Sequence, residues 1–330
     1  MNQSNKIKWG IIGCGKIAHK FASDLAMIED AELTAVASRN IEKAKEFAQR
    51  HNSIKTYGSY DALFSDTDVD IVYIATPHHL HAELSITAME NDKHVLCEKP
   101  LSLNKKEASA IIETSRRTNR FFMEALWTRF NPSFMEVKRR IDNGEIGQVK
   151  YINADFAFRS NFPLEDRTTN ISLGGGAILD IGIYPAFLSY VLLGIPKEIL
   201  AKSIFHKTAS SDVQTSMIFH YAEAQAILYS SFESQSDMVA RISGSEGQIY
   251  LNHRWHHTNG YTLIKNCKEQ EIELPVLGLG YSHEILECQD CLRKNRIESP
   301  NWSHQNSLEL ISILDDVRKQ VGLKYPQEEN

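Results

Sequence analysis

The fold is decided by the segment Ile11-Ile12-Gly13-Cys14-Gly15-Lys16-Ile17-Ala18. A short apolar run precedes this segment and a helical pattern follows it, which is the strand–turn–helix setting in which a Gly-x-Gly-x-x-Gly/Ala pattern binds a dinucleotide. Gly13 permits the sharp turn, and Gly15 lets a pyrophosphate approach the backbone at the helix N-terminus. The alternative is an ordinary tight turn. We expect cofactor contacts from Gly13, Cys14, Gly15, Lys16 and Ile17.

Strands and helices alternate along the first 125 residues. The expected strands are short and continuously apolar, as strands buried on both faces are, and they cover residues 8–12, 33–37, 71–75, 94–97 and 121–123. Helical patterns separate them over 17–27, 41–51, 79–91 and 105–118. This alternation predicts an α/β fold, with a Rossmann-type doubly wound parallel sheet over residues 1–125.

The pattern changes near Trp127. From residue 149 the expected strands are longer, alternate between apolar and polar positions and are separated by turn signals. They cover 149–158, 198–205, 213–220, 224–232, 238–243 and 248–251, and helices are expected over 131–143, 177–193, 284–294 and 303–321. We therefore expect residues 126–330 to form an α+β domain, in which helices cover one face of a large open, mostly antiparallel sheet.

The composition is that of a globular protein, because 42% of the 330 residues are hydrophobic and 24% are charged. The formal net charge of −6 argues against nucleic acid or an anionic membrane as partner, and no apolar run is long enough to span a bilayer. No signal-peptide pattern precedes the first strand, and the five cysteines are scattered. We expect a cytoplasmic protein with reduced thiols, and no metal or redox role for Cys288-x-x-Cys291.

The end of the second expected strand favours NADP over NAD. NAD-binding folds usually place Asp or Glu there to hold the ribose 2′-hydroxyl, whereas this chain has Ser38 and Arg39. Arg39 can grip a 2′-phosphate as a charged fork, and Ser38 can donate a hydrogen bond to it. Lys43, one helical turn further on, can assist. The alternative, a solvated arginine at a helix start, leaves both cofactors open.

A second group of candidate cofactor contacts follows the third expected strand, at the edge where ligands bind in such sheets. It consists of Thr76, Pro77, His78 and His81. This stretch is rich in histidine, but no nearby cysteine or pair of carboxylates completes a ligand set, so we expect no metal. The histidines at 253, 256 and 257 are likewise interpreted as part of a polar loop.

The motif Glu98-Lys99-Pro100 ends the next expected strand. Proline stops the strand and keeps Lys99 out of helical geometry, so the lysine is presented at the same edge of the sheet. There it can polarise a substrate oxygen or relay a proton. The alternative is a surface lysine before a proline. Glu98 and Lys99 are also counted among the expected cofactor contacts.

A carboxylate and a phenol share one face of the apolar helix that Gly174-Gly175-Gly176 opens. Asp180 and Tyr184 are four residues apart, which places both on the same side of a helix. Such groups are costly to bury without partners, so the two residues are candidates for a functional site. The alternative is a pair of satisfied core residues.

Together and in this order, the motifs resemble the Gfo/Idh/MocA family of oxidoreductases over essentially the whole chain. The resemblance rests on Gly13-x-Gly15-x-x-Ala18, on Ala75-Thr76-Pro77 with His81, on Glu98-Lys99-Pro100 and on the helix from Gly174 to Tyr184. Within the family, residues 123–132 and the Asp180–Tyr184 pair are most similar to dimeric dihydrodiol dehydrogenases and NADP-dependent aldose (xylose-type) dehydrogenases. Many other branches carry histidine in place of Tyr184, which argues against the Asp–His mechanism of inositol dehydrogenases.

The resemblance implies a Rossmann domain that binds NADP, or NAD, and a second domain that binds substrate and forms a homodimer, or a dimer of dimers, through its sheet. It also implies that Lys99 lies near the substrate oxygen and the nicotinamide, across from Tyr184. Three further residues are then expected to wall the substrate pocket beside Asp180 and Tyr184, namely Trp127, Arg129 and Phe156.

Our hypothesis is the reversible NADP-dependent oxidation of a CH–OH group in a sugar, polyol or trans-dihydrodiol, with hydride passing to the nicotinamide. Tyr184 accepts the hydroxyl proton with help from the Lys99 ammonium, and Lys99 as the direct base stays open. Asp180 orients the substrate hydroxyls or Lys99. Two alternatives are a glycoside hydrolase that retains its cofactor through a redox cycle, and a non-enzymatic NADP(H) sensor, which needs no proton relay.

Overall fold

The computed structural model describes residues 6–328, which divide into two compact units. Within these residues, unit 1 comprises 6–102, 106–127 and 277–308, and unit 2 comprises the rest. The expected boundary after residue 125 lies close to Trp127, the last residue of unit 1 before the chain enters the long segment 128–276 of unit 2. The expectation of an uninterrupted second domain over 126–330 differs from the structure, because residues 277–308 return to unit 1.

Unit 1 contains the predicted doubly wound sheet, whose strand order is β3-β2-β1-β4-β5-β6 and whose neighbours all pair in parallel. The strands are β1 (Ile7–Ile12), β2 (Ala31–Ala37), β3 (Lys55–Tyr57), β4 (Ile71–Ile74), β5 (His94–Glu98) and β6 (Phe122–Ala125). The helices are α1 (Lys16–Leu25), α2 (Ile41–His51), α3 (Tyr60–Phe64), α4 (His81–Glu90), α5 (Lys105–Thr118) and α8 (Ser282–Arg293). This is the strand order of dinucleotide-binding folds.

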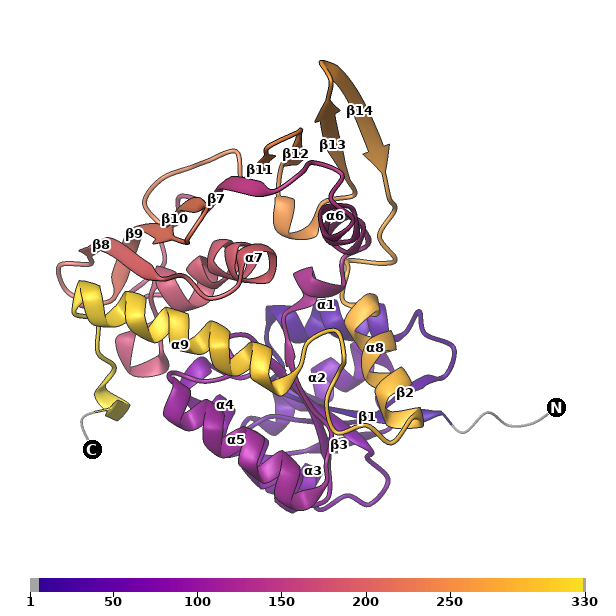
Figure 1. Cartoon of the computed structure of the whole chain (residues 1–330). Helices are drawn as coiled ribbons and strands as arrows, with labels where there is room; N and C mark the ends of the chain where they lie inside the picture. The colour runs from indigo at the N-terminus through magenta and orange to yellow at the C-terminus, as the bar shows by residue number, and fades with distance from the viewer. Residues whose placement is uncertain (1–5, 329–330) are drawn as a thin grey trace. The chain divides into compact units, whose positions relative to one another are not determined.

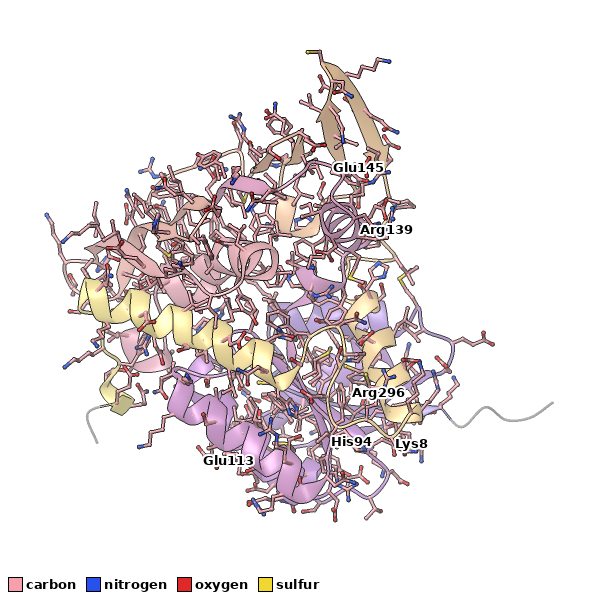
Figure 2. All side chains as sticks on the ribbon, in the orientation of Figure 1. Lys8, His94, Glu113, Arg139, Glu145 and Arg296 are labelled. Carbon is pink, nitrogen blue, oxygen red and sulfur yellow. The ribbon has the colours of Figure 1, made fainter. Side chains whose placement is uncertain are left out.

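The apolar strand sequences explain this architecture. Every residue of β4 is buried, as is nearly all of β1 and the middle of β5, because helices cover both faces of a parallel sheet. Lys8 and His94 lie near the starts of β1 and β5 (Figure 2). The opposite, carboxyl ends of the same strands therefore meet at one edge, which carries the residues expected to bind the cofactor.

A buried carboxylate explains why residues 277–308 belong to unit 1. Asp24 of α1 is 1% exposed, and its side chain accepts backbone hydrogen bonds from Leu279 (2.8 Å), Tyr281 (2.8 Å) and Ser282 (3.1 Å). These bonds join the start of α8 to a helix more than 250 residues earlier in the chain. A hydrogen-bond pattern of this kind has no local sequence signal.

Unit 2 contains the predicted large sheet, with the strand order β14-β13-β12-β11-β7-β10-β9-β8 (Figure 1). All neighbours pair antiparallel except β7 and β10, which are parallel. The strands are β7 (Val149–Ala157), β8 (Glu198–Phe205), β9 (Asp212–His220), β10 (Gln225–Ser231), β11 (Ala240–Gly244), β12 (Gln248–Leu251), β13 (Gly260–Lys265) and β14 (Lys268–Glu273). The hairpin of β13 and β14 was not expected from the sequence.

One face of this sheet is covered by α7 (Ile183–Leu193) and by the short π-helical turn Ile178–Gly182 that precedes it (Figure 1). The strands alternate between buried and exposed positions accordingly, as in β9. The remaining helices are α6 (Pro132–Asp142) and α9 (His304–Val321), and α9 begins in unit 1 and continues in unit 2. Among the described residues, no helix is long and apolar enough to cross a membrane.

A second buried carboxylate fixes the start of the π-helical turn. Asp212 is fully buried at the start of β9, and its Oδ2 accepts hydrogen bonds from the backbone N–H of Ile178 (2.7 Å) and the hydroxyl of Thr215 (3.2 Å). Gly176 has a φ of +133°, and a β-carbon there would lie 2.1 Å from Asp212 Oδ1. The glycine is therefore needed for the close approach of the two segments.

Burial gives Asp212 a measurable effect on stability. It raises the pKa of Asp212 from 3.8 to about 6, against the opposing effect of the hydrogen bonds from Ile178 and Thr215. The folded state thus binds this proton more tightly than the unfolded state, so the contribution of Asp212 to stability falls as the pH rises from about 4 to about 6. The loss amounts to roughly 3 kcal/mol at most.

We therefore predict that Asp212→Asn abolishes this part of the pH dependence. In urea unfolding followed by tryptophan fluorescence, the free energy of unfolding of the variant should rise relative to that of the wild type between pH 4 and pH 6.5. Parallel pH profiles for the two proteins would show that Asp212 does not titrate in this way.

Candidate active site

The turn after β1 has the geometry that a dinucleotide pyrophosphate needs. Gly13 has a φ of +88°, and a β-carbon there would lie 2.5 Å from the carbonyl oxygen of Ala75. Gly15 caps the N-terminus of α1, and within the described chain no side-chain hydrogen bond caps this helix. Apart from its own chain neighbours, no atom of the described residues lies within 4 Å of the position of a β-carbon on Gly15. Open space in front of unsatisfied helix N–H groups fits an anionic group.

The residues expected to select the cofactor gather at the end of β2. The Arg39 guanidinium forms a hydrogen bond with the phenol of Tyr60 on α3, where burial raises the pKa of Tyr60 and the Arg39 charge opposes that rise. Burial likewise raises the pKa of Cys14 to about 11, against the nearby charge of Lys43. The hydroxyl of Ser38 accepts a hydrogen bond from a backbone N–H at 3.2 Å, so its own proton can still be donated.

The second group of expected cofactor contacts lies at the ends of β4 and β5. Thr76 and His78 are 7% and 5% exposed, and His81 is fully buried. The Nε2 atom of His81 lies 2.8 Å from the carbonyl oxygen of Thr76, and its Nδ1 atom lies 2.8 Å from the carbonyl oxygen of Pro100. His81 thus connects the turn after β4 to the turn after β5.

Lys99 follows β5 in a turn that lies beside two acidic residues, of which Glu124 is buried and Glu98 is half-buried. Glu98 accepts a hydrogen bond from the phenol of the buried Tyr73. Glu124 of β6 is 2% exposed and accepts a hydrogen bond from the backbone N–H of Leu101 at 3.0 Å. Burial raises the pKa of Glu124, whereas the charge of Lys99 lowers it, so the ammonium group lies within electrostatic range of this carboxylate. No sequence motif indicates a role for Glu124 or Tyr73.

In unit 2, Asp180 and Tyr184 lie on the segment formed by the π-helical turn and α7, and both are 5% exposed. Arg167 forms an ion pair with Asp180, with 3.0 Å between Nη1 and Oδ1. The ring of Tyr184 lies 5.2 Å from that of Phe156 and 5.3 Å from that of His256, measured between centroids. Phe156 and His256 stack on each other at 4.2 Å.

This cluster contains two residues that the sequence did not reveal. His256, interpreted above as part of a polar loop, is 6% exposed and contributes its ring to the wall beside Tyr184. Arg167 comes from a loop without a recognisable motif. Of the other expected pocket residues, Trp127 belongs to unit 1, where its ring stacks on Tyr281 at 4.7 Å, and Arg129 belongs to unit 2.

The two clusters differ in what they can do chemically. The edge of unit 1 combines a glycine turn at an open helix N-terminus, a cationic strand end and a lysine on a supported turn. The cluster of unit 2 combines a phenol, a carboxylate neutralised by a guanidinium and two stacked rings. Over residues 6–328, no group of three or more histidine, cysteine, aspartate or glutamate side chains is arranged to hold a metal ion.

Comparisons with known proteins agree with the motifs and the fold. Residues 7–126 match the model of the oxidoreductase family with an NAD-binding Rossmann fold, and residues 134–250 match the GFO/IDH/MocA C-terminal domain. The chain is 35% identical over 332 residues to trans-1,2-dihydrobenzene-1,2-diol dehydrogenase of Xenopus tropicalis, covering 97% of this chain and 99% of that protein. The human enzyme of the same name is 32% identical over 335 residues, with 98% and 99% coverage.

Solved structures with the same fold contain nicotinamide cofactors. A crystal structure of KijD10, a 3-ketoreductase from Actinomadura kijaniata, in complex with NADP and TDP-benzene matches with a TM-score of 0.87 at 27% identity, covering 96% of this chain and 98% of that one. Levoglucosan dehydrogenase with NADH and levoglucosan matches in fold alone, with a TM-score of 0.86 at 21% identity and coverage of 98% and 100%. The predicted family, fold class and NAD(P)-dependent oxidoreductase activity are confirmed, and the chain belongs to the Gfo/Idh/MocA family of oxidoreductases.

Proposed function

We propose that this enzyme oxidises the CH–OH group of a trans-dihydrodiol with NADP⁺, and that sugars and polyols of similar shape are secondary substrates. The observation that carries the proposal is the cluster around Tyr184 in unit 2. The rings of Phe156 and His256 beside the phenol suit a flat unsaturated ring, and the Asp180–Arg167 pair suits its hydroxyls. The dihydrodiol dehydrogenases related to this chain along nearly its whole length support the same substrate class.

We assign the proton chemistry to Tyr184 and Lys99. Tyr184 accepts the proton of the substrate hydroxyl, and the Lys99 ammonium stabilises the charge that develops on the oxygens. Asp180 lies one helical turn before Tyr184, and an unpaired carboxylate there would oppose a phenolate. The ion pair with Arg167 at 3.0 Å offsets that charge, so Asp180 orients the substrate without suppressing the base.

We assign the binding of NADP to residues at the edge of unit 1. NADP, when bound, supplies the nicotinamide carbon that accepts the hydride. We propose that the turn Gly13–Ile17 holds the pyrophosphate, that Ser38, Arg39 and Lys43 hold the 2′-phosphate, and that Thr76, Pro77, His78 and Glu98 line the nicotinamide side. Because both ring nitrogens of His81 lie against backbone carbonyls, we propose that His81 supports this side through the position of Thr76.

We further propose a cytoplasmic homodimer, or a dimer of dimers, formed through the outer face of the large sheet. Leu200, Ile218 and Ile227 are 54%, 40% and 43% exposed on that face. They are neighbours across β8, β9 and β10, since Leu200 pairs with Ile218 and Ile218 pairs with Ile227. A contiguous apolar stripe of this kind supports a protein contact. The five cysteines are all free thiols, which is typical of a reducing compartment.

Removing the phenolic hydroxyl should impair catalysis and leave cofactor binding intact. We predict that Tyr184→Phe lowers kcat for a trans-dihydrodiol about 100- to 1000-fold and changes the Kd for NADPH less than about threefold. Lys99→Met should have a similar effect on kcat. Both are measured by absorbance at 340 nm and by NADPH fluorescence titration.

The matched control is Tyr190→Phe, the same change on the same helix. The Tyr190 phenol donates a hydrogen bond to Glu309 at 2.6 Å, and its loss should leave kcat within about twofold of the wild-type value. Near-normal turnover of Tyr184→Phe would overturn the assignment of the base. Equal losses of kcat in both tyrosine variants would mean that the substitutions disturb α7, and that the Tyr184 phenol has no specific role in proton transfer.

The charge of Arg39 should decide between the two cofactors. We predict that Arg39→Ala raises the Kd for NADP⁺ about 10- to 100-fold, because a charge-assisted hydrogen bond contributes roughly 1.5–3 kcal/mol. The Kd for NAD⁺ should stay nearly unchanged. The control is Arg50→Ala at the far end of α2, which should affect neither cofactor. Equal weakening of both cofactors by Arg39→Ala would contradict the role in 2′-phosphate binding.

A further inference from the structure

Two buried ionisable side chains hold the same peptide group, the one that joins Pro100 to Leu101. The carbonyl oxygen of this peptide lies 2.8 Å from Nδ1 of His81, and its N–H donates to Oε1 of Glu124 at 3.0 Å. His81 and Leu101 are fully buried, and Glu124 is 2% exposed. This peptide lies one residue after Lys99, so the two contacts hold the lysine turn on its C-terminal side.

The partners of His81 favour one protonation state. Its second ring nitrogen, Nε2, lies 2.8 Å from the carbonyl oxygen of Thr76. A carbonyl oxygen accepts hydrogen bonds and cannot donate them, and a neutral imidazole carries only one N–H. Both contacts are hydrogen bonds only if both nitrogens carry protons, which is the state of an imidazolium cation.

The partners of Glu124 favour the opposite charge. Oε1 accepts the N–H of Leu101, and Oε2 faces the indole N–H of Trp302 at 3.2 Å and the hydroxyl of Ser307 at 2.7 Å. The backbone N–H and the indole N–H can only donate, and the hydroxyl of Ser307 can donate as well. A carboxylate accepts all three of these hydrogen bonds at once.

We propose that His81 and Glu124 form a buried ion pair that acts through the Pro100–Leu101 peptide and positions Lys99 for the reaction. A single buried charge is costly, and the pair offsets that cost because the cation polarises the peptide oxygen while the anion polarises the N–H of the same group. The positioning role rests on the function proposed for Lys99. The charge state of the pair does not depend on that function.

Other titratable groups lie on the elements packed around this pair. His78 lies on the turn before α4, with its ring centroid 5.6 Å from that of His81. Cys97 and Glu98 end β5, and Lys99 follows them. The charge of Lys99 lowers the pKa of Glu124. Glu98 accepts a hydrogen bond from the phenol of Tyr73. A test of the pair must therefore separate the effect of Glu124 on His81 from a general change of charge in unit 1.

The first test reads the protons of His81 directly, in the full-length protein with ¹⁵N-labelled histidine. Long-range ¹H–¹⁵N NMR spectra distinguish an imidazolium from either neutral tautomer, and His81→Gln identifies the resonances. We expect both nitrogens of His81 to be protonated at pH 7.5. We further expect Glu124→Gln to shift the loss of the second proton to lower pH, because the variant lacks the anion that stabilises the cation.

The matched control is Glu284→Gln, which changes a second buried glutamate of unit 1. Glu284 is fully buried, and neither of its carboxylate oxygens has a hydrogen-bond partner among the described residues. This variant should leave the titration of His81 unchanged. A neutral His81 at pH 7.5, or a titration that Glu124→Gln does not move, would overturn the ion pair.

The second test separates positioning from binding. We expect Glu124→Gln to lower kcat about 10- to 100-fold, with KM for the diol and Kd for NADPH changed less than about threefold, while Glu284→Gln keeps the wild-type kcat. An unchanged kcat in a variant that shows the NMR shift would overturn the positioning role and leave the ion pair. If Lys99→Met itself keeps full turnover, the proposed function of Lys99 fails instead, whatever the NMR result.

Discussion

The cofactor edge of this enzyme depends on a backbone contact that only glycine permits. A β-carbon on Gly13 would lie 2.5 Å from the carbonyl oxygen of Ala75, so the turn after β1 passes directly against the end of β4. From there a continuous series of contacts follows the edge: Thr76 to His81, His81 to Pro100, and Leu101 to Glu124. The glycine turn after β1 and the lysine turn are thus parts of one connected structure.

Buried acids that accept backbone N–H groups recur as the means of joining distant segments. Asp24 holds the start of α8, Asp212 holds the π-helical turn, and Glu124 holds the lysine turn. In each case a carboxylate satisfies backbone donors that would otherwise be buried without partners. The same physical solution therefore stabilises the fold and fixes the segments that carry Lys99, Asp180 and Tyr184.

Local signals predicted much of this structure. The apolar strands and Gly13-x-Gly15 gave the parallel sheet, and period-two alternation gave most of the second sheet. The strongly polar β14 has no apolar face to reveal it. Arg167, His256 and Glu124 were missed because their roles come from partners far away in the chain. The return of residues 277–308 to unit 1 was missed for the same reason, since Asp24 is what fixes it.

The most direct test of the central claim is the fate of the hydrogen on the carbinol carbon. The wild-type enzyme would be given NADP⁺ and a trans-dihydrodiol carrying deuterium at that carbon, and the reduced cofactor would be analysed by mass spectrometry. We predict NADPH that is one mass unit heavier, formed in proportion to the oxidised diol. Reduced cofactor without the label, or no reduced cofactor across a panel of diols and sugars despite NADPH binding, would contradict it.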